Sequence, residues 1–208
     1  MNFWMYAALT VSMLFSAGSL LGETKVLAFS GSMRMGSSNQ RLVADAARMA
    51  TEMGAKVTVI NLRDYPIAFF DEDLEKNLGM PPKARDLRKM MLNSDVIFIS
   101  TPEYNGSVTP VLKNALDWMS RDEEGKPSRT AYQGKRFLLL SASPGQEGGT
   151  RGLQNLKSIV EEVGGNVVVG TLAVPNVFNA FNSSGQLKDA AQNKALQELV
   201  QKAVKSTP

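Results

Sequence analysis

Apolar residues along the chain gather in short runs that have the character of β-strands. Polar or glycine-rich segments bound these runs, which contain many β-branched and aromatic residues. Two runs are almost continuously apolar, as expected for strands that helices cover on both faces of a sheet. The predicted strands span residues 25–29, 56–61, 95–100, 136–141 and 166–171.

The segments between these runs have the spacing of amphipathic helices. In the first segment apolar residues recur every three or four positions, and Gly54 follows as a typical helix end. The predicted helices span residues 41–53, 82–91, 110–119, 150–163 and 187–204. Strands that alternate with helices predict an α/β fold, a doubly wound parallel sheet with helices on both faces.

A length of 208 residues with 43% hydrophobic residues suits one globular domain with a sizeable core. The formal net charge is +3, and the charged residues are spread along the chain rather than gathered in a block. This distribution argues against nucleic acid as a partner, whereas mild basicity suits an anionic small molecule. The chain contains no cysteine and no histidine. It therefore has no disulfide, thiol nucleophile or Ser-His-Asp triad, and no metal site is predicted.

Residues 3–21 form an uncharged and mostly apolar stretch. Its length fits a membrane span, a signal peptide with an extended apolar region, or a start site assigned too far upstream. The sequence does not choose among these interpretations, because no Lys or Arg precedes the stretch and several Ser, Thr and Gly residues dilute it. We divide the chain into an apolar segment, 1–22, and a domain, 23–208. A cytoplasmic location is favoured, with membrane association or export through residues 3–21 as the alternatives.

The first predicted strand leads directly into a loop suited to an anion. Residues 31–39 read Gly-Ser-Met-Arg-Met-Gly-Ser-Ser-Asn and precede a helix, whose amino end offers unpaired N–H groups and a partial positive charge. Serine hydroxyls and the Arg34 guanidinium add donors for phosphate oxygens. The loop is neither a Walker A motif nor a dinucleotide G-x-G-x-x-G motif. The plain alternative is a serine-rich turn in which Ser38 or Asn39 caps the helix.

Two further loops follow the third and fourth predicted strands. Residues 101–107 contain the turn Tyr104-Asn105-Gly106, and residues 143–151 are rich in glycine. Ligands of doubly wound sheets lie beyond the carboxyl ends of the strands, where all three loops are expected to meet. Glycine allows the backbone to approach a flat ring closely. The plain alternatives are an ordinary Asn-Gly turn and a flexible connection.

These three loops together resemble the signature loops of the NADPH-dependent FMN reductases, a family that includes chromate, quinone and azo reductases. The matching segments are residues 31–39, 102–107 and 143–151, and the resemblance runs from about Thr24 to the end of the last helix. Residues 65–74 are similar to the family segment after the second strand, which commonly contributes subunit contacts.

The resemblance implies a flavodoxin-like fold with strand order 2-1-3-4-5 and non-covalently bound FMN. By the family pattern, the FMN phosphate would be held by Ser32, Arg34, Ser37 and Asn39. The isoalloxazine would be lined by Pro102, Glu103, Tyr104, Asn105 and Gly106. The other side of the cradle would be completed by Ser143, Gly145, Gly148 and Gly149.

The implied activity is an oxidoreductase that passes hydride from NADPH or NADH through FMN to a small acceptor, namely a quinone, azo compound, flavin or metal oxyanion. FMN carries this chemistry, so no catalytic side chain is assigned. Arg34, Arg121 and Arg151 are cations that could meet the 2′-phosphate of NADPH, although solvated surface arginines are the favoured interpretation. A homodimer or homotetramer is also implied.

Two alternatives come from other functional classes. A flavodoxin-type electron carrier would bind FMN and exchange single electrons with protein partners without NADPH. Such carriers are generally acidic and use a threonine-rich phosphate loop, so the reductase is preferred for this basic chain. A non-catalytic FMN- or anion-binding module would lack redox turnover, and a colourless protein that FMN cannot reconstitute would favour it.

Deletion of residues 1–22 is expected to leave both the Tm and the affinity for FMN unchanged. Each of the three interpretations of this stretch places it outside the domain. Thermal unfolding and flavin titration of the full and shortened chains check this expectation. Loss of folding in the shortened chain would instead make the stretch part of the domain.

Overall fold

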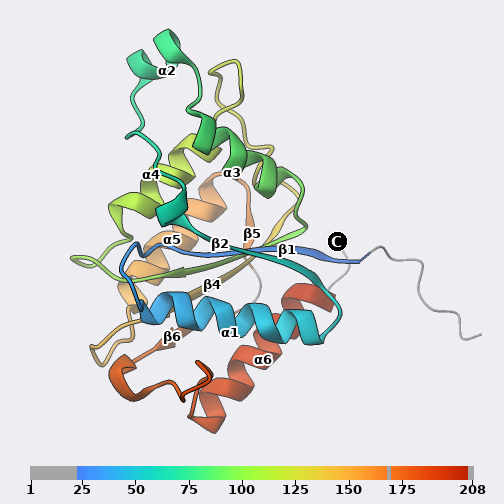
Figure 1. Cartoon of the computed structure of the whole chain (residues 1–208), viewed down its shortest axis with the longest axis vertical. Helices are drawn as coiled ribbons and strands as arrows, with labels where there is room; N and C mark the ends of the chain where they lie inside the picture. The colour runs from blue at the N-terminus through green and yellow to red at the C-terminus, as the bar shows by residue number, and fades with distance from the viewer. Residues whose placement is uncertain (1–22, 168–169, 206–208) are drawn as a thin grey trace, which may run out of the picture.

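A parallel β-sheet forms the centre of the computed structural model, which describes residues 23–167 and 170–205. Its strand order is β2-β1-β3-β4-β5, and β6 also pairs with β4 (Figure 1). The predicted order 2-1-3-4-5 is thereby confirmed. The strands are β1 (Lys25–Ser30), β2 (Lys56–Asn61), β3 (Val96–Thr101), β4 (Arg136–Ala142), β5 (Asn166–Val167) and β6 (Leu172–Val174).

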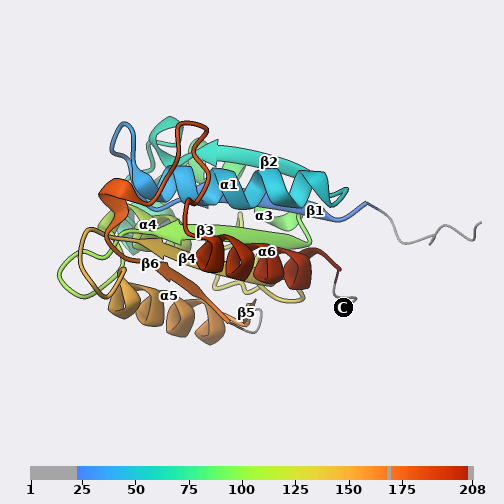
Figure 2. The same ribbon diagram turned by 90° about the horizontal axis from the view of Figure 1, so that it is seen from below.

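Helices cover both faces of this sheet, as predicted. Helices α1 and α6 lie side by side on one face, which Figure 2 shows, and α3, α4 and α5 pack on the other. The helices are α1 (Ser38–Glu52), α2 (Glu72–Leu78), α3 (Pro82–Leu92), α4 (Pro110–Met119), α5 (Thr150–Glu162) and α6 (Ala190–Lys205). Two short 3₁₀-helices are η1 (Leu62–Asp64) and η2 (Val177–Asn179).

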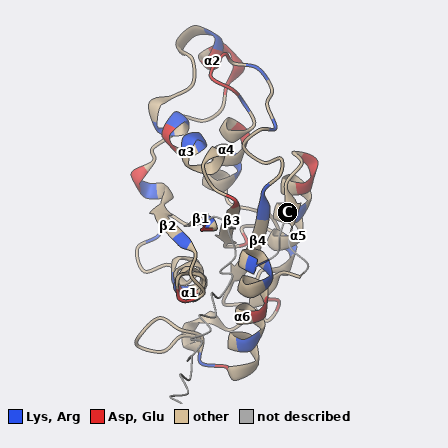
Figure 3. Cartoon of the chain, turned by 90° about the vertical axis from the view of Figure 1, so that its right-hand side faces the viewer, with Lys and Arg blue, Asp and Glu red and all other residues tan. Residues whose placement is uncertain are grey.

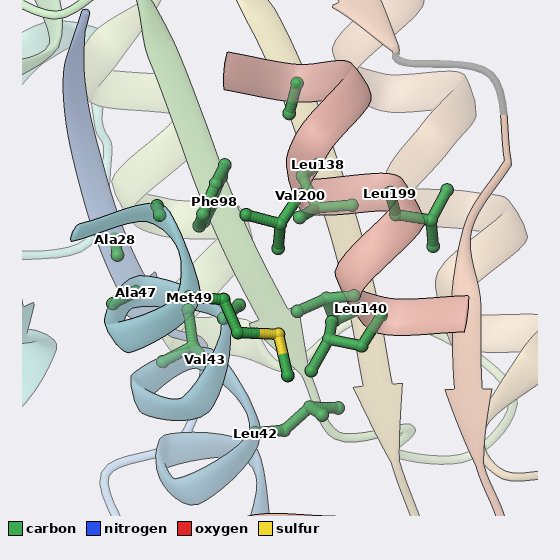
Figure 4. Packing of buried hydrophobic residues seen from close by; sticks show 14 of the residues in the cluster. Ala28, Leu42, Val43, Ala47, Met49, Phe98, Leu138, Leu140, Leu199 and Val200 are labelled. Carbon is green, nitrogen blue, oxygen red and sulfur yellow. The ribbon is translucent and has the colours of Figure 1, made fainter. Parts of the chain in front are cut away.

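Successive residues of the central strands point to opposite faces of the sheet and are buried on both. Ala28, Phe98 and Leu138 belong to the core beneath α1 and α6, where Val43 and Val200 also lie (Figure 4). Their sequence neighbours on each strand belong to the second core, beneath α3, α4 and α5. Because side chains alternate with a period of two, a strand covered on both faces must be apolar at every position. This arrangement explains the uninterrupted apolar runs in the sequence.

The first and last long helices begin at residues other than those predicted. Helix α1 starts at Ser38 because Ser37 caps it, with the Ser37 hydroxyl accepting the Asn39 N–H at 3.2 Å. The predicted start at 41, and a cap at Ser38 or Asn39, were therefore wrong. Helix α6 starts at Ala190 instead of residue 187, because the Asp189 carboxylate accepts the Gln192 N–H at 2.8 Å and marks the helix start.

The fifth predicted strand, 166–171, differs from the structure. Its first two residues form β5, residues 168–169 lie outside the described residues, and residues 170–171 are not in a strand before β6 begins at Leu172. Gly170, which precedes β6, has φ +96°, a backbone conformation that no extended strand adopts. Strand β6 then continues along β4, so the edge of the sheet reaches Val174.

The segment between η1 and α3 forms an excursion that the periodicity did not predict to contain a helix. Two side chains of α4 hold it. The Asn114 amide donates to the carbonyls of Ile67 and Ala68 at 3.2 and 3.1 Å and accepts the Phe70 N–H at 2.8 Å. Trp118 Nε1 donates to the Ala68 carbonyl at 2.8 Å. The chain there is thus fastened through its backbone, and the Phe70 ring also packs against Trp118 with centroids 5.1 Å apart.

Helix α2 is fastened in turn by a buried ion pair. Arg121 Nη2 lies 2.6 Å from Glu75 Oε2, and only 3% of the Glu75 side chain is exposed. The same guanidinium donates to the Gly125 carbonyl at 2.6 Å, and hydrogen bonding to Glu75 raises the pKa of Arg121. Arg121 therefore has a structural role on this side of the molecule. The expected solvated surface arginine was wrong for this residue, because its side chain is only 15% exposed and is paired with Glu75.

Charged residues of both signs are dispersed over the ribbon in Figure 3, with several acidic ones on α2. In the part of the chain that the structure describes, no helix is long and apolar enough to cross a membrane. The predicted apolar stretch, residues 3–21, lies outside the described residues.

Candidate functional site

A cleft of about 220 Å³ lies where the loops after β1, β3 and β4 meet beyond the carboxyl ends of the strands. This is the position that the sheet topology predicts for a ligand. The cleft is lined by Ser32, Arg34, Ser37, Ser38, Asn39, Pro102, Glu103, Tyr104, Ala142, Ser143, Pro144, Val177 and Phe178.

The loop after β1 is fixed at its first residue. The Gly31 N–H donates to the Ser100 carbonyl at 2.9 Å, and the Gly31 carbonyl accepts the Thr109 hydroxyl at 2.6 Å. A Cβ on Gly31 would lie 2.9 Å from Leu112 Cδ2, so a larger residue would push the loop away from α4. Glycine thus allows the loop to start in close contact with α4.

Serine hydroxyls then shape the loop from within. Ser30 Oγ accepts the Ser32 N–H at 3.1 Å, and Ser32 Oγ accepts the Arg34 N–H at 3.3 Å. Arg63, on η1, donates from Nε to the Met33 carbonyl at 3.1 Å and also bonds it through Nη2. These contacts hold the loop at its entrance and its middle before it reaches the start of α1.

The two arginines near this loop have different surroundings. Arg63 is engaged with the loop backbone, whereas no described residue gives the Arg34 guanidinium a hydrogen bond or ion pair. Arg34 nevertheless lines the cleft, near the amino end of α1 with its unpaired N–H groups. The loop therefore brings a cation and hydroxyls together at the cleft, and the binding of an anion there stays a prediction.

Asn39 joins α1 to the two central strands. Its amide donates to the Ala142 carbonyl at 2.8 Å, and its carbonyl oxygen accepts the Ser100 hydroxyl at 2.8 Å and the Ala142 N–H at 2.9 Å. The residue is only 3% exposed. In this structure the Asn39 side chain positions the amino end of α1, and a phosphate contact by Asn39 stays a prediction.

The loop after β3 closes in a tight turn. Tyr104 and Ser107 exchange backbone hydrogen bonds of 2.9 and 3.0 Å, and between them Asn105 and Gly106 have φ values of +52° and +78°. Positive φ at both central residues is the reason that an Asn-Gly pair suits this turn. The side chain of Tyr104 lines the cleft, whereas Asn105 and Gly106 form the turn outside its lining.

Glu103 ties this turn to the start of α5. Its carboxylate lies 2.8 Å from Arg151 Nη2 and accepts the Gly152 N–H at 3.1 Å. Burial favours the neutral carboxyl, but the hydrogen bonds from Gly152 and Arg151 outweigh it, so the pKa of Glu103 is lowered from its ordinary 4.5. Arg151 is consequently paired within the chain.

Glycines of the loop after β4 serve packing against neighbouring strands. A Cβ on Gly148 would lie 2.9 Å from the carbonyl carbon of Val174, and one on Gly149 would lie 2.1 Å from Ser141 Oγ. Gly149, with φ +87°, also caps α5. Ser143 lines the cleft, whereas Gly145, Gly148 and Gly149 are not among its lining residues.

The lining includes Ser38, one of the serine hydroxyls expected in the loop after β1, and four residues that were not predicted from the sequence. These four are Ala142, Pro144, Val177 and Phe178. The first two adjoin the predicted Ser143, whereas the last two belong to η2, which reaches the cleft because β6 continues along β4 to Val174. Had the predicted fifth strand been extended to Val174, η2 would have been expected at the carboxyl edge of the sheet. Among the described residues, no cluster of acidic side chains could hold a metal ion.

The donor set fits an organic phosphate with a planar ring. Hydroxyls of Ser32 and Ser37 and the cation of Arg34 stand at a helix amino end, and Tyr104 adds an aromatic surface to the same cleft. The cleft is thus suited to FMN, whose phosphate and flat isoalloxazine match both parts of the lining.

Fold and cleft together define a flavodoxin-like α/β protein with a site for a phosphorylated aromatic ligand. The family model for NADPH-dependent FMN reductase matches residues 24–179. The chain therefore belongs to the NADPH-dependent FMN reductase family.

Individual relatives agree with this assignment. An NAD(P)H-dependent FMN reductase of Pseudomonas aeruginosa is 32% identical over 184 residues, which cover 86% of this chain and 92% of that reductase. A quinone reductase of Escherichia coli is 31% identical, over 66% of this chain and 70% of its own. The structure of FerB, a flavoenzyme NAD(P)H:(acceptor) oxidoreductase from Paracoccus denitrificans, matches with a TM-score of 0.74 and 25% identity, over 87% of this chain and 95% of FerB.

Arg34→Ala is expected to weaken FMN binding roughly 10- to 100-fold, because a hydrogen bond to a charged group contributes about 1.5–3 kcal/mol. Fluorescence titration of FMN measures the change. Arg41→Ala is the matched control, since it removes the same charge from α1 at a position outside the cleft lining. Equal losses in both variants, or no loss for Arg34→Ala, would contradict a direct contact.

Glu103→Gln is expected to lower the free energy of unfolding at pH 7 and to match the unaltered protein in strong acid. The folded state lowers the pKa of Glu103, so its stabilisation is full above the unfolded value of 4.5 and disappears as pH falls through the folded value. Urea unfolding of both proteins between pH 7 and pH 3 measures this difference. A difference that persists at the acid end would show that the ionised carboxylate is not its source.

Proposed function

We propose that the cleft between the three loops is the FMN site of an NAD(P)H-dependent oxidoreductase that reduces a small acceptor. One observation supports this most strongly: the Arg34 cation, which no described residue pairs, shares one cleft at the carboxyl edge of the sheet with the serine hydroxyls and the Tyr104 ring. That combination occurs in a chain of the FMN reductase family.

The phosphate end of the site is assigned to the loop before α1. Ser32 and Ser37 offer hydroxyls, Arg34 offers a guanidinium and the amino end of α1 offers N–H groups. Arg63 and Asn39 support this group by holding the loop and the helix in place. Apart from the exposed Arg34 side chain, the phosphate is therefore bound by groups whose positions the fold already determines.

The ring end is assigned to the loops after β3 and β4. Pro102 and Tyr104 line one side of the cleft, and Ser143 lines another. The pairing of Glu103 with Arg151 keeps the turn at a fixed distance from α5. FMN, when bound, supplies the two-electron chemistry that connects a nicotinamide hydride donor with an acceptor. The chain itself binds and orients the reactants.

The names of the relatives support one class of electron acceptor for this chain. The Escherichia coli relative is a quinone reductase, and we propose a quinone or another small planar oxidant for this chain. Azo compounds, flavins and metal oxyanions are the other acceptors that the family resemblance implies. We also propose a homodimer or homotetramer in which the segment 65–74 contributes subunit contacts.

FMN-loaded protein is expected to lose its flavin absorbance without air when one equivalent of NADPH or NADH is added, since each nucleotide delivers two electrons. Stopped-flow absorbance measures the rate, and free FMN at the same concentration is the control. Flavin that binds without bleaching would indicate an electron carrier. Protein that takes up no FMN would indicate a different ligand for the cleft.

A further inference from the structure

We propose that Phe178 packs against bound FMN and shields it from solvent. The inference rests on the proposed function, because FMN is the occupant of the cleft. Phe178 belongs to η2 and lines the cleft with Arg34 and Tyr104, although the family pattern assigns it no role. It is 79% exposed among the described residues, so the chain itself covers little of its ring.

The local backbone directs Phe178 away from the core. Val177, immediately before it, is buried in the core beneath α1 and α6, whereas Phe178 is exposed. In a tight helical turn, neighbouring residues point in different directions. Because Val177 faces the core, the side chain of Phe178 faces away from the core and lines the cleft.

The position of η2 is fixed from both sides. Before it, Ser143 donates its N–H to the Val174 carbonyl at 3.0 Å and accepts the Val177 N–H at 3.3 Å. After it, the buried Asp45 carboxylate accepts the Leu187 N–H at 3.1 Å. The cleft residue Ser143 therefore holds the start of η2 directly, and the backbone that carries Phe178 is fixed beside the cleft.

The chemistry of the cleft identifies the occupant that Phe178 contacts. A single exposed phenylalanine is ordinary on a protein surface. Here, however, the ring adjoins an anion-binding loop, where an aromatic side chain adds nothing to the binding of a bare phosphate. A ligand that joins a phosphate to an apolar ring uses both, and FMN is such a ligand.

Phe178→Ala is expected to raise the Kd for FMN, and its dissociation rate, about tenfold, the change expected when roughly half of an aromatic ring is buried on binding. Phe178→Tyr keeps the ring and should bind FMN as the unaltered protein does. Flavin fluorescence measures Kd, and stopped-flow displacement measures the dissociation rate. The Tm of both variants should be unchanged, because the side chain is largely exposed.

Leu78→Ala is the matched control, since Leu78 is 80% exposed on α2 and lies outside the cleft lining. Unchanged FMN binding in this variant, together with the loss in Phe178→Ala, supports the inference. Equal binding by Phe178→Ala and the unaltered protein, or equal weakening by Leu78→Ala, overturns it while leaving the proposed function intact. Absence of FMN binding by the unaltered protein overturns the proposed function, and this inference with it.

Discussion

The buried amide of Asn39 is the interaction on which the geometry of the site depends. It joins the first turn of α1 to Ser100 at the end of β3 and to both backbone groups of Ala142 at the end of β4. A parallel sheet brings strand ends to one edge, but it does not decide how a helix start is oriented there. The Asn39 side chain fixes this orientation. A buried amide left without these partners lowers the stability of the folded state by about 1–3 kcal/mol. The loops after β1, β3 and β4 are thus held together at their bases by the Asn39 side chain.

Near Asn39, some side chains hold the loops in place and others line the cleft. Thr109 and Arg63 use their polar atoms on loop backbones. Arg34 and Tyr104 face the cleft instead, and Glu103 both lines the cleft and pairs with Arg151. Binding groups whose supports are already satisfied need little reorganisation when the ligand arrives, which favours affinity. A flavin reductase requires this kind of cleft, because the cofactor performs the chemistry and the protein has to hold it in one orientation.

Sequence patterns predicted the sheet and the edge at which the cleft lies, because both depend on local signals. Apolar periodicity locates strands and helices, and Gly31 and the Asn105-Gly106 turn mark backbone requirements that are visible in the residue types. Contacts between distant residues could not be predicted in this way. The capture of Asn39 by β3 and β4 depends on tertiary packing that no local pattern encodes, and the entry of Phe178 into the cleft depends on where the last strand ends.

The way in which the segment between η1 and α3 is attached to α4 affects which substitutions this segment tolerates. Asn114 and Trp118 hold it through main-chain atoms of Ile67, Ala68 and Phe70. Backbone carbonyls and N–H groups are the same for nearly every amino acid, so substitutions at outward positions leave this attachment intact. Substitutions can therefore change the side chains that the segment exposes while its backbone hydrogen bonds to α4 are kept.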